Sequence, residues 1–357
     1  MRAAVPFTLS LLVLAGCLGG GAPAETKAAV NATAGGGLNL QSMASGAPPV
    51  DAAKPTLDAP PQWRQGEWWT VKVTDGFDGG VYTGTRIVAG MEPDDYLVGM
   101  PQGEFSDQLM VLHIPGFGQV SKKDLSFDVH NKNFAPLNFP LTEGKEWDTA
   151  FEGRPIHAKA HVTSPTEAVI SLQGANDHMN VTYDATLGEI KKIAYDGYAD
   201  LEVTGHGYGY QGVVTVPHMF KLVFQNARVA GVLDGSAAPQ PGVDETVTVD
   251  PTFDRVSFVI LLGNLQAGVP TAAGYYRETV TGPDGTSYDL QYAPPEDAGA
   301  YKMGFFTAQH PGGDWKFHHV AAGPGIAMAE GIAYHVYQID LPSGRILPST
   351  GQHHHGG

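Results

Sequence analysis

The chain has 357 residues, hydrophobic residues make up 42% of it, and its formal net charge is -16. This acidity argues against nucleic acid and against anionic lipid as partners, because both require clustered Lys and Arg. The single Cys excludes an internal disulfide, so the fold must be held by its cores alone. With 46 Gly and 26 Pro, the composition favours short strands and turns, and we predict an all-β protein.

The first apolar run ends in a cleavage-box pattern made of Leu14, Ala15, Gly16 and Cys17. Arg2 precedes an apolar core of the length expected for a signal sequence, and the run is shorter than the roughly 20 residues of a spanning helix. The pattern resembles the bacterial and archaeal lipobox, which implies that residues 1–16 are removed and that Cys17 is lipidated. The alternative is an ordinary secretory signal with an incidental Cys. We expect an extracytoplasmic protein that is lipid-anchored to the cell membrane.

Residues 17–60 contain the cysteine followed by Gly, Ala, Pro, Ser and Thr, with few large apolar side chains. Such a segment buries too little surface to offset the entropy of ordering, so we predict a disordered tether. Asn31 lies in this segment in an acceptor sequon, and Asn180 lies in another one further along the chain. Both are candidate glycosylation sites.

The first folded domain is predicted to span residues 61–229. Residues 156–162 alternate apolar side chains with His157, Lys159 and His161, which is the period of a strand with one face toward water. Further strands are predicted at 68–74, 81–88, 96–100, 108–114, 169–172, 179–183, 190–198, 213–216 and 220–229. No segment has the pattern of a long amphipathic helix.

Two short stretches of this domain are similar to segments of lipoproteins with a half-barrel sheet. They are Phe139–Trp147, with the pattern "FPL..G..W", and the strand-turn-strand Tyr183–Ile190. The resemblance implies a curved antiparallel sheet or partial barrel whose concave face would accept an apolar ligand.

A Pro- and Gly-containing linker is predicted at 230–243, followed by a second domain at 244–342. Short runs of strand composition are separated there by turn signals, which is the spacing of a β-sandwich with a jelly-roll or immunoglobulin-like arrangement. The order of strands and turns resembles sandwich domains of the pre-peptidase C-terminal type. That resemblance implies an accessory module that binds or spaces, with Trp315 in its core.

Few residues suggest chemistry. Residues 207–212 match the dinucleotide fingerprint as a string, but a strand pattern follows where the mechanism needs a helix. His157 and His161 would lie about 13 Å apart along a strand, too far to share an ion. The tail, residues 343–357, contains His353, His354 and His355, which would bind Zn or Cu weakly or represent a remnant of an affinity tag. No cofactor is predicted.

We therefore expect a non-catalytic binding or cell-surface scaffolding protein, whose partner is a cell-surface protein or glycan. The aromatic residues Trp68, Trp69, Tyr208 and Tyr210 are either ligand-facing or part of the core. The alternatives are a carrier of a lipid or other apolar molecule in the first domain, and metal binding by the histidine tail. An enzyme that assembles carboxylates from distant strands is a further alternative, for which the sequence offers no pair.

Overall fold

The computed structural model describes residues 56–75, 80–107, 109–110, 114–129, 132–175, 177–196, 199–230, 243–263, 276–291, 302–321 and 325–347. In these ranges the chain is almost entirely antiparallel β-structure, in one 17-stranded and one four-stranded sheet. The predicted all-β fold, with a curved sheet and a sandwich, is confirmed. No helix in the described residues has the length and hydrophobicity that a membrane span requires.

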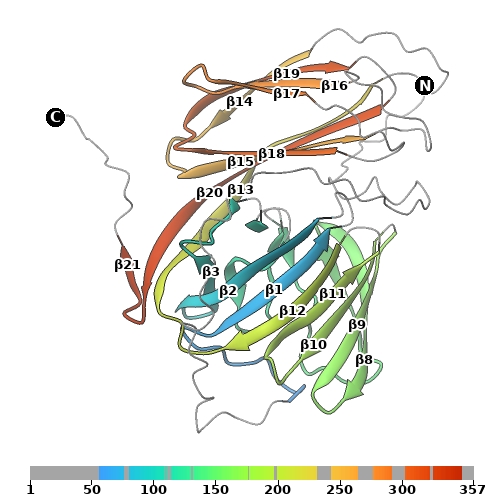
Figure 1. Ribbon diagram of the computed structural model, residues 1–357. Helices are drawn as coiled ribbons and strands as arrows, with labels where there is room; N and C mark the ends of the chain where they lie inside the picture. The colour runs from blue at the N-terminus through green and yellow to red at the C-terminus, as the bar shows by residue number, and fades with distance from the viewer. Residues whose placement is uncertain are drawn as a thin grey trace.

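The lower part of Figure 1 is a curved antiparallel sheet. Sequence neighbours pair from β1 to β6 and from β7 to β12, and the β12–β1 pairing joins the two runs into a partial barrel. Its strands are β1 (Trp68–Asp75), β2 (Val81–Met91), β3 (Asp95–Pro101), β4 (Gly118–Ser121), β5 (Phe127–Val129), β6 (Lys132–Phe134), β7 (Glu146–Phe151), β8 (Arg154–Ser164), β9 (Glu167–Gln173), β10 (His178–Asp184), β11 (Glu189–Tyr195) and β12 (Ala199–Gly207).

β8 shows how the sequence pattern produces this sheet. Ile156, Ala158 and Ala160 are buried, while the alternating His and Lys side chains are exposed, as the period of two predicts. The turn before it has positive φ angles at Glu152 (50°) and Gly153 (78°), which are those of a two-residue type I′ hairpin. This turn geometry matches the strand twist and fixes the β7–β8 register.

The strand predicted at 108–114 is wrong at residues 109 and 110, where the structure describes a helical turn. The amide of Met110 donates to the carbonyl oxygen of Ser106, and the amide of Ile114 donates to that of Leu109, which is a helical turn. The Ser106 hydroxyl accepts from the Leu109 amide at 3.3 Å, as a helix cap does. The apolar run looks like a strand in the sequence because Leu109, Met110 and Ile114 pack into the core.

Two long strands connect the lower part to the upper part. β13 (Gly212–Ala230) and β20 (Gly325–Leu341) pair antiparallel along their lengths, from the register pair Gly212 and Leu341 to the pair Ala230 and Gly325. One end of this pair of strands adjoins β3 and β21 (Arg345–Leu347), and the other end adjoins β15. The separately predicted strands 213–216 and 220–229 are one strand with a register shift after His218.

The upper part is a sandwich, as predicted. Its four-stranded sheet contains β14 (Val243–Val249), β19 (Gly313–Ala321), β16 (Tyr276–Thr281) and β17 (Ser287–Gln291), and it faces β15 (Arg255–Gly263), β18 (Lys302–Gln309) and the ends of β13 and β20 (Figure 1). Trp315 is 3% exposed and packs against Phe258 and Phe306, which confirms its predicted place in the core.

The predicted linker, 230–243, lies almost entirely outside the described residues. The sequence assigns β13 to the first domain and β20 to the second, but the two strands pair continuously. A polar clamp adds to this connection: a guanidinium nitrogen of Arg255 lies 2.9 and 2.7 Å from the carboxylate oxygens of Asp107, and the Tyr334 hydroxyl donates to the same carboxylate. The two parts therefore share strands and a side-chain contact.

Candidate functional site

A buried network of charged side chains lies inside the curved sheet, at the end where β1 begins. Arg86 and Glu189 form an ion pair of 2.6 Å with both side chains almost fully buried, and Arg86 also donates to the Gly116 carbonyl at 2.8 Å. Burial raises the pKa of the Glu189 carboxyl, and the nearby Arg86 guanidinium opposes that rise. A second buried carboxylate, Glu67, lies 3.0 Å from His206. The network links strands β2, β11 and β12 to the start of β1.

The segment before β1 closes this end of the core. The Trp63 indole donates to the Gly188 carbonyl at 2.6 Å, and its backbone amide donates to the Tyr96 hydroxyl at 3.0 Å. Leu57 is buried in the main core, and Figure 1 shows the blue N-terminal segment running along the lower end of the sheet. The turn at residues 64–66 follows, with Gly66 at φ 81° and its carbonyl accepting from the Tyr210 amide.

Above this network lies a surface formed by the side chains of Arg64, Gln65, Tyr208, Tyr210 and Arg345, which we call the tyrosine surface. Both arginines and Gln65 are exposed, and both tyrosines are half-buried. A Cβ at Gly344 would lie 2.7 Å from the side-chain amide nitrogen of Gln65, so the β20–β21 turn contacts the 64–66 turn.

The tyrosine hydroxyls and the arginine guanidinium groups of the tyrosine surface are free of protein partners within the described residues. Neither tyrosine hydroxyl has a hydrogen bond there, and neither arginine has an ion pair. Burial raises the pKa of both Tyr208 and Tyr210, so both hydroxyls stay protonated and can donate. The Tyr208 ring packs edge-on against His206 at 4.9 Å, which ties the surface to the buried network.

The two tryptophans predicted as either ligand-facing or core belong to the core. Trp69 is fully buried, stacks on His206 at 5.4 Å and donates to the Leu187 carbonyl at 3.0 Å. Trp68 is 9% exposed and lies on the opposite face of β1, over Gly207. Neither ring offers a surface to a ligand.

The remaining predicted site residues are not brought together. Asn180 is exposed on β10, where its amide oxygen accepts from Ser171. His157 and His161 point outward from β8, as predicted. The string 207–212 leads into strand β13 and not into a helix. Several residues lie outside the described ranges: the box Leu14, Ala15, Gly16 and Cys17, the sequon Asn31, and the tail His353, His354 and His355.

The buried carboxylate of Asp177 serves a structural ion pair. Asp177 is 2% exposed, lies 2.8 Å from Arg154, and accepts from the Tyr195 hydroxyl. The described residues contain no group of three or more His, Cys, Asp or Glu side chains that is arranged to hold a metal ion.

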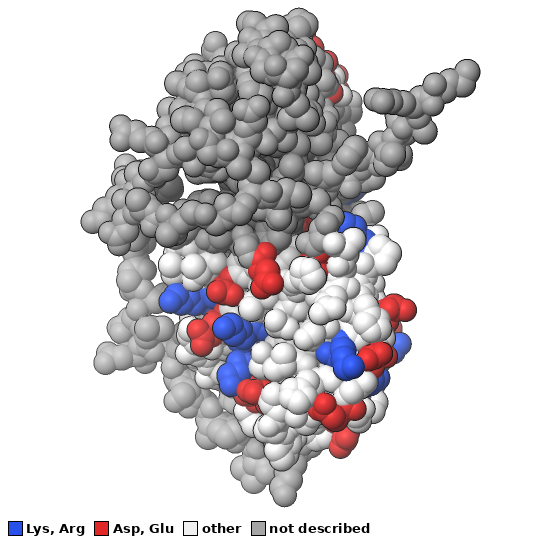
Figure 2. Space-filling model, turned by 90° about the vertical axis from the view of Figure 1, so that its right-hand side faces the viewer, with Lys and Arg blue, Asp and Glu red and all other residues white. Residues whose placement is uncertain are grey.

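The concave side of the curved sheet is filled by its own chain. Leu172 and Val181 of the sheet belong to one core with Phe117, Phe127 and Phe134, which come from the segment between β3 and β7. An apolar ligand would have to displace these side chains. On the face drawn in Figure 2, acidic and basic residues are interspersed over the lower part, without a field of one sign.

The sequence pattern does not single out Arg64, Gln65 and Arg345, or the buried residues Glu67, Arg86, Glu189 and His206 below them. They come from separate strands and turns, and only the strand register brings them together. The aromatic density of 207–212 was the one usable signal.

No model of a known protein family matches the chain, and no curated protein matches it. Among solved structures, an exo-β-1,3-galactanase from Phanerochaete chrysosporium with galactose aligns at 8% identity and a TM-score of 0.19, covering 74% of this chain and 68% of that one. The Gt strain of infectious bursal disease virus aligns at 9% identity and a TM-score of 0.12, covering 80% of this chain and 70% of that chain. Likenesses this low support no statement about fold or activity.

Proposed function

We propose that this chain is a lipid-anchored extracytoplasmic protein that binds a cell-surface protein or glycan through the tyrosine surface and does not catalyse a reaction. The observation that carries the proposal is the set of free donors on that surface. The guanidinium groups of two exposed arginines and the hydroxyls of two half-buried tyrosines lack protein partners in the described part of the chain. Tyr and Arg are enriched in binding interfaces, where they supply most of the energy.

The buried network supports this proposal because it preorganises the surface. The Glu67 carboxylate accepts from the Arg64 amide at 3.0 Å and lies 3.0 Å from His206, which packs against Tyr208. A surface that is already ordered loses less entropy when it binds. The carboxylates of Glu67 and Glu189 are engaged in these contacts, which favours a structural role for them over acid–base catalysis.

Two experiments test the proposal. Full-length protein with Cys17→Ser is expected to leave the membrane fraction of its own cells, because the proposed anchor is the lipid on this cysteine. The released protein should bind to isolated cell envelopes prepared from cells that do not make this protein. The double change Tyr208→Ala and Tyr210→Ala should abolish that binding. The control is Tyr288→Ala, a change to an exposed tyrosine of the sandwich. Continued membrane attachment of the Cys17→Ser protein contradicts the proposal. Equal envelope binding by the double tyrosine variant and by the Tyr288→Ala control also contradicts it.

A further inference from the structure

We infer that the ligand of the tyrosine surface is an acidic saccharide, in which sugar rings carry carboxylate groups. This inference rests on the proposed function and names the ligand class of the same site.

The arginines indicate the acidic part. Arg86, Arg154 and Arg255 each bind a carboxylate of the protein. Arg64 and Arg345 are exposed and have no carboxylate within ion-pair distance in the described ranges, although the chain carries a net charge of -16. A guanidinium matches a carboxylate with two parallel hydrogen bonds, so a carboxylate-bearing ligand would fill both free positions.

The two arginines lie on either side of one contact. Arg64 precedes Gln65, and Arg345 follows Gly344. Because Gln65 contacts the turn at Gly344, the two backbone segments that carry Arg64 and Arg345 meet at this contact. Gln65 donates to the Ala89 carbonyl at 3.1 Å, which holds its side chain in place between them.

The tyrosines indicate the saccharide part. Gly209 separates the two tyrosines in the sequence, and a Cβ at this position would meet nothing within 4 Å. The loop therefore has open space at Gly209, between the two half-buried tyrosines. A tyrosine ring packs against the apolar face of a sugar, while its hydroxyl bonds to sugar oxygens.

The test is isothermal titration calorimetry of the full chain carrying Cys17→Ser. The ligands are hexagalacturonate and, as the uncharged control, its methyl ester. We expect hexagalacturonate to bind more tightly than its methyl ester. Added salt should weaken the binding of hexagalacturonate and leave the binding of the ester unchanged. The double change Arg64→Gln and Arg345→Gln should reduce the affinity for hexagalacturonate to that for the ester, by about two- to five-fold per arginine. The affinity for the ester should stay unchanged. Tyr208→Ala should weaken the binding of both ligands. The control is Lys316→Gln, an exposed position on β19.

Folding of each variant is checked by circular dichroism. If Tyr208→Ala unfolds, it is replaced by Tyr208→Phe, which keeps the ring. Tyr208→Phe should weaken the binding of both ligands, because the hydroxyl is lost. Equal acid and ester affinities, insensitive to the arginine changes, overturn the acidic assignment. An acidic peptide, poly-glutamate, that binds as tightly as the saccharide overturns the saccharide assignment. If neither saccharide binds while envelope binding still needs Tyr208 and Tyr210, the inference fails and the proposed function stands; if envelope binding is also independent of them, both fail.

Discussion

At the scale of single residues, Arg86 and Glu189 show how the cost of a buried charge depends on its partner. Their contact is 2.6 Å, with side-chain exposures of 8% and 3%. We predict that Arg86→Met destabilises the protein by about 3–5 kcal/mol, because it leaves a carboxylate buried without its cation. Urea unfolding measures this. Adding Glu189→Leu should recover much of the loss, and the exposed change Arg64→Met should stay within about 0.5 kcal/mol. A double variant no more stable than the single one would refute this explanation.

Gly207 is needed for a close approach. A Cβ at this position would lie 2.5 Å from the Trp68 ring. We predict that Gly207→Ala shifts the tryptophan fluorescence and costs about 1–3 kcal/mol through overpacking. Gly205→Ala is the matched control on the same strand, since its Cβ would have 3.3 Å to the nearest atom. Equal effects of both changes on fluorescence and stability would contradict the assignment.

The sequence alone left Trp68 and Trp69 either in the core or facing a ligand, and the reason is physical. Adjacent residues of a strand point to opposite faces, and whether a face is covered depends on chain segments far away. Trp69 is covered by the segment before β1 and by β12, and Trp68 by β13 and β20. Neither relation is contained in the local pattern.

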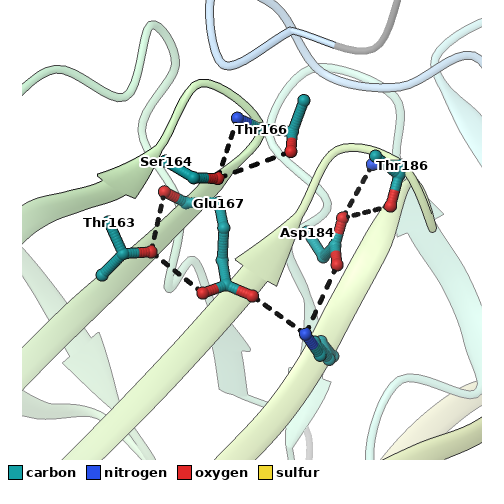
Figure 3. A network of polar contacts seen from close by, with 7 residues as sticks. Thr163, Ser164, Thr166, Glu167, Asp184 and Thr186 are labelled. Carbon is teal, nitrogen blue, oxygen red and sulfur yellow. Dashed lines mark hydrogen bonds and ion pairs between the residues drawn. The ribbon is translucent and has the colours of Figure 1, made fainter.

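At the scale of elements, the hairpin tips of β8–β9 and β10–β11 are joined by a surface network (Figure 3). Lys191 lies 2.9 Å from Glu167 and 3.6 Å from Asp184. The Lys191 hydrogen bond, together with one from Thr163, holds the pKa of Glu167 below its usual value. Burial acts to raise the pKa of Asp184, but the hydroxyl and amide of Thr186 and the charge of Lys191 bring it below its usual value.

A carboxyl whose pKa is lowered by folding stabilises the protein above the unfolded pKa, near 4.3 for Glu, and loses that contribution as the pH falls through the folded value. We therefore predict that Lys191→Met reduces stability at pH 7 by less than about 1 kcal/mol and flattens the loss of stability between pH 5 and pH 3. Urea midpoints at several pH values measure both effects. The control is Lys192→Met, the exposed neighbouring lysine of β11, for which no ion pair with Glu167 or Asp184 is formed. An unchanged pH profile in Lys191→Met would contradict the prediction.

Element prediction succeeded where the local pattern was decisive and failed where tertiary contacts decided. The alternation in β8 and the strands of the sandwich were predictable. The start of β20 at Gly325 was not, because its glycines suggest a loop; at Gly331 a Cβ would lie 2.7 Å from the Phe258 ring, so glycine is required there by packing. Strand β12 was also missed, and the partial barrel depends on its pairing with β1.

At the scale of the whole molecule, the core of the curved sheet lies between two closures. The N-terminal segment covers one end through Leu57, and the sandwich covers the other through Val259 and Tyr334, which belong to the same core (Figure 1). The tyrosine surface lies at the N-terminal closure and is therefore remote from the sandwich.

The clamp between Asp107 and Arg255 should control how firmly the two parts are held together. We predict that Arg255→Met increases protease cleavage in residues 101–117, because the segment loses its charged contact and the packing of the guanidinium on Phe105. Limited proteolysis followed by mass spectrometry measures this, with Arg345→Met as the exposed control. Cleavage unchanged from that of the native protein would show that the shared strands alone hold the two parts.

The location of binding is tested most directly by hydrogen–deuterium exchange of the full-length Cys17→Ser protein with and without hexagalacturonate. We predict slower exchange in peptides that cover residues 64–67, 206–212 and 343–346, and unchanged exchange across β8 and β9. Protection at saturating ligand that falls elsewhere, or that is absent from these three segments, would contradict the assignment of the tyrosine surface as the binding site.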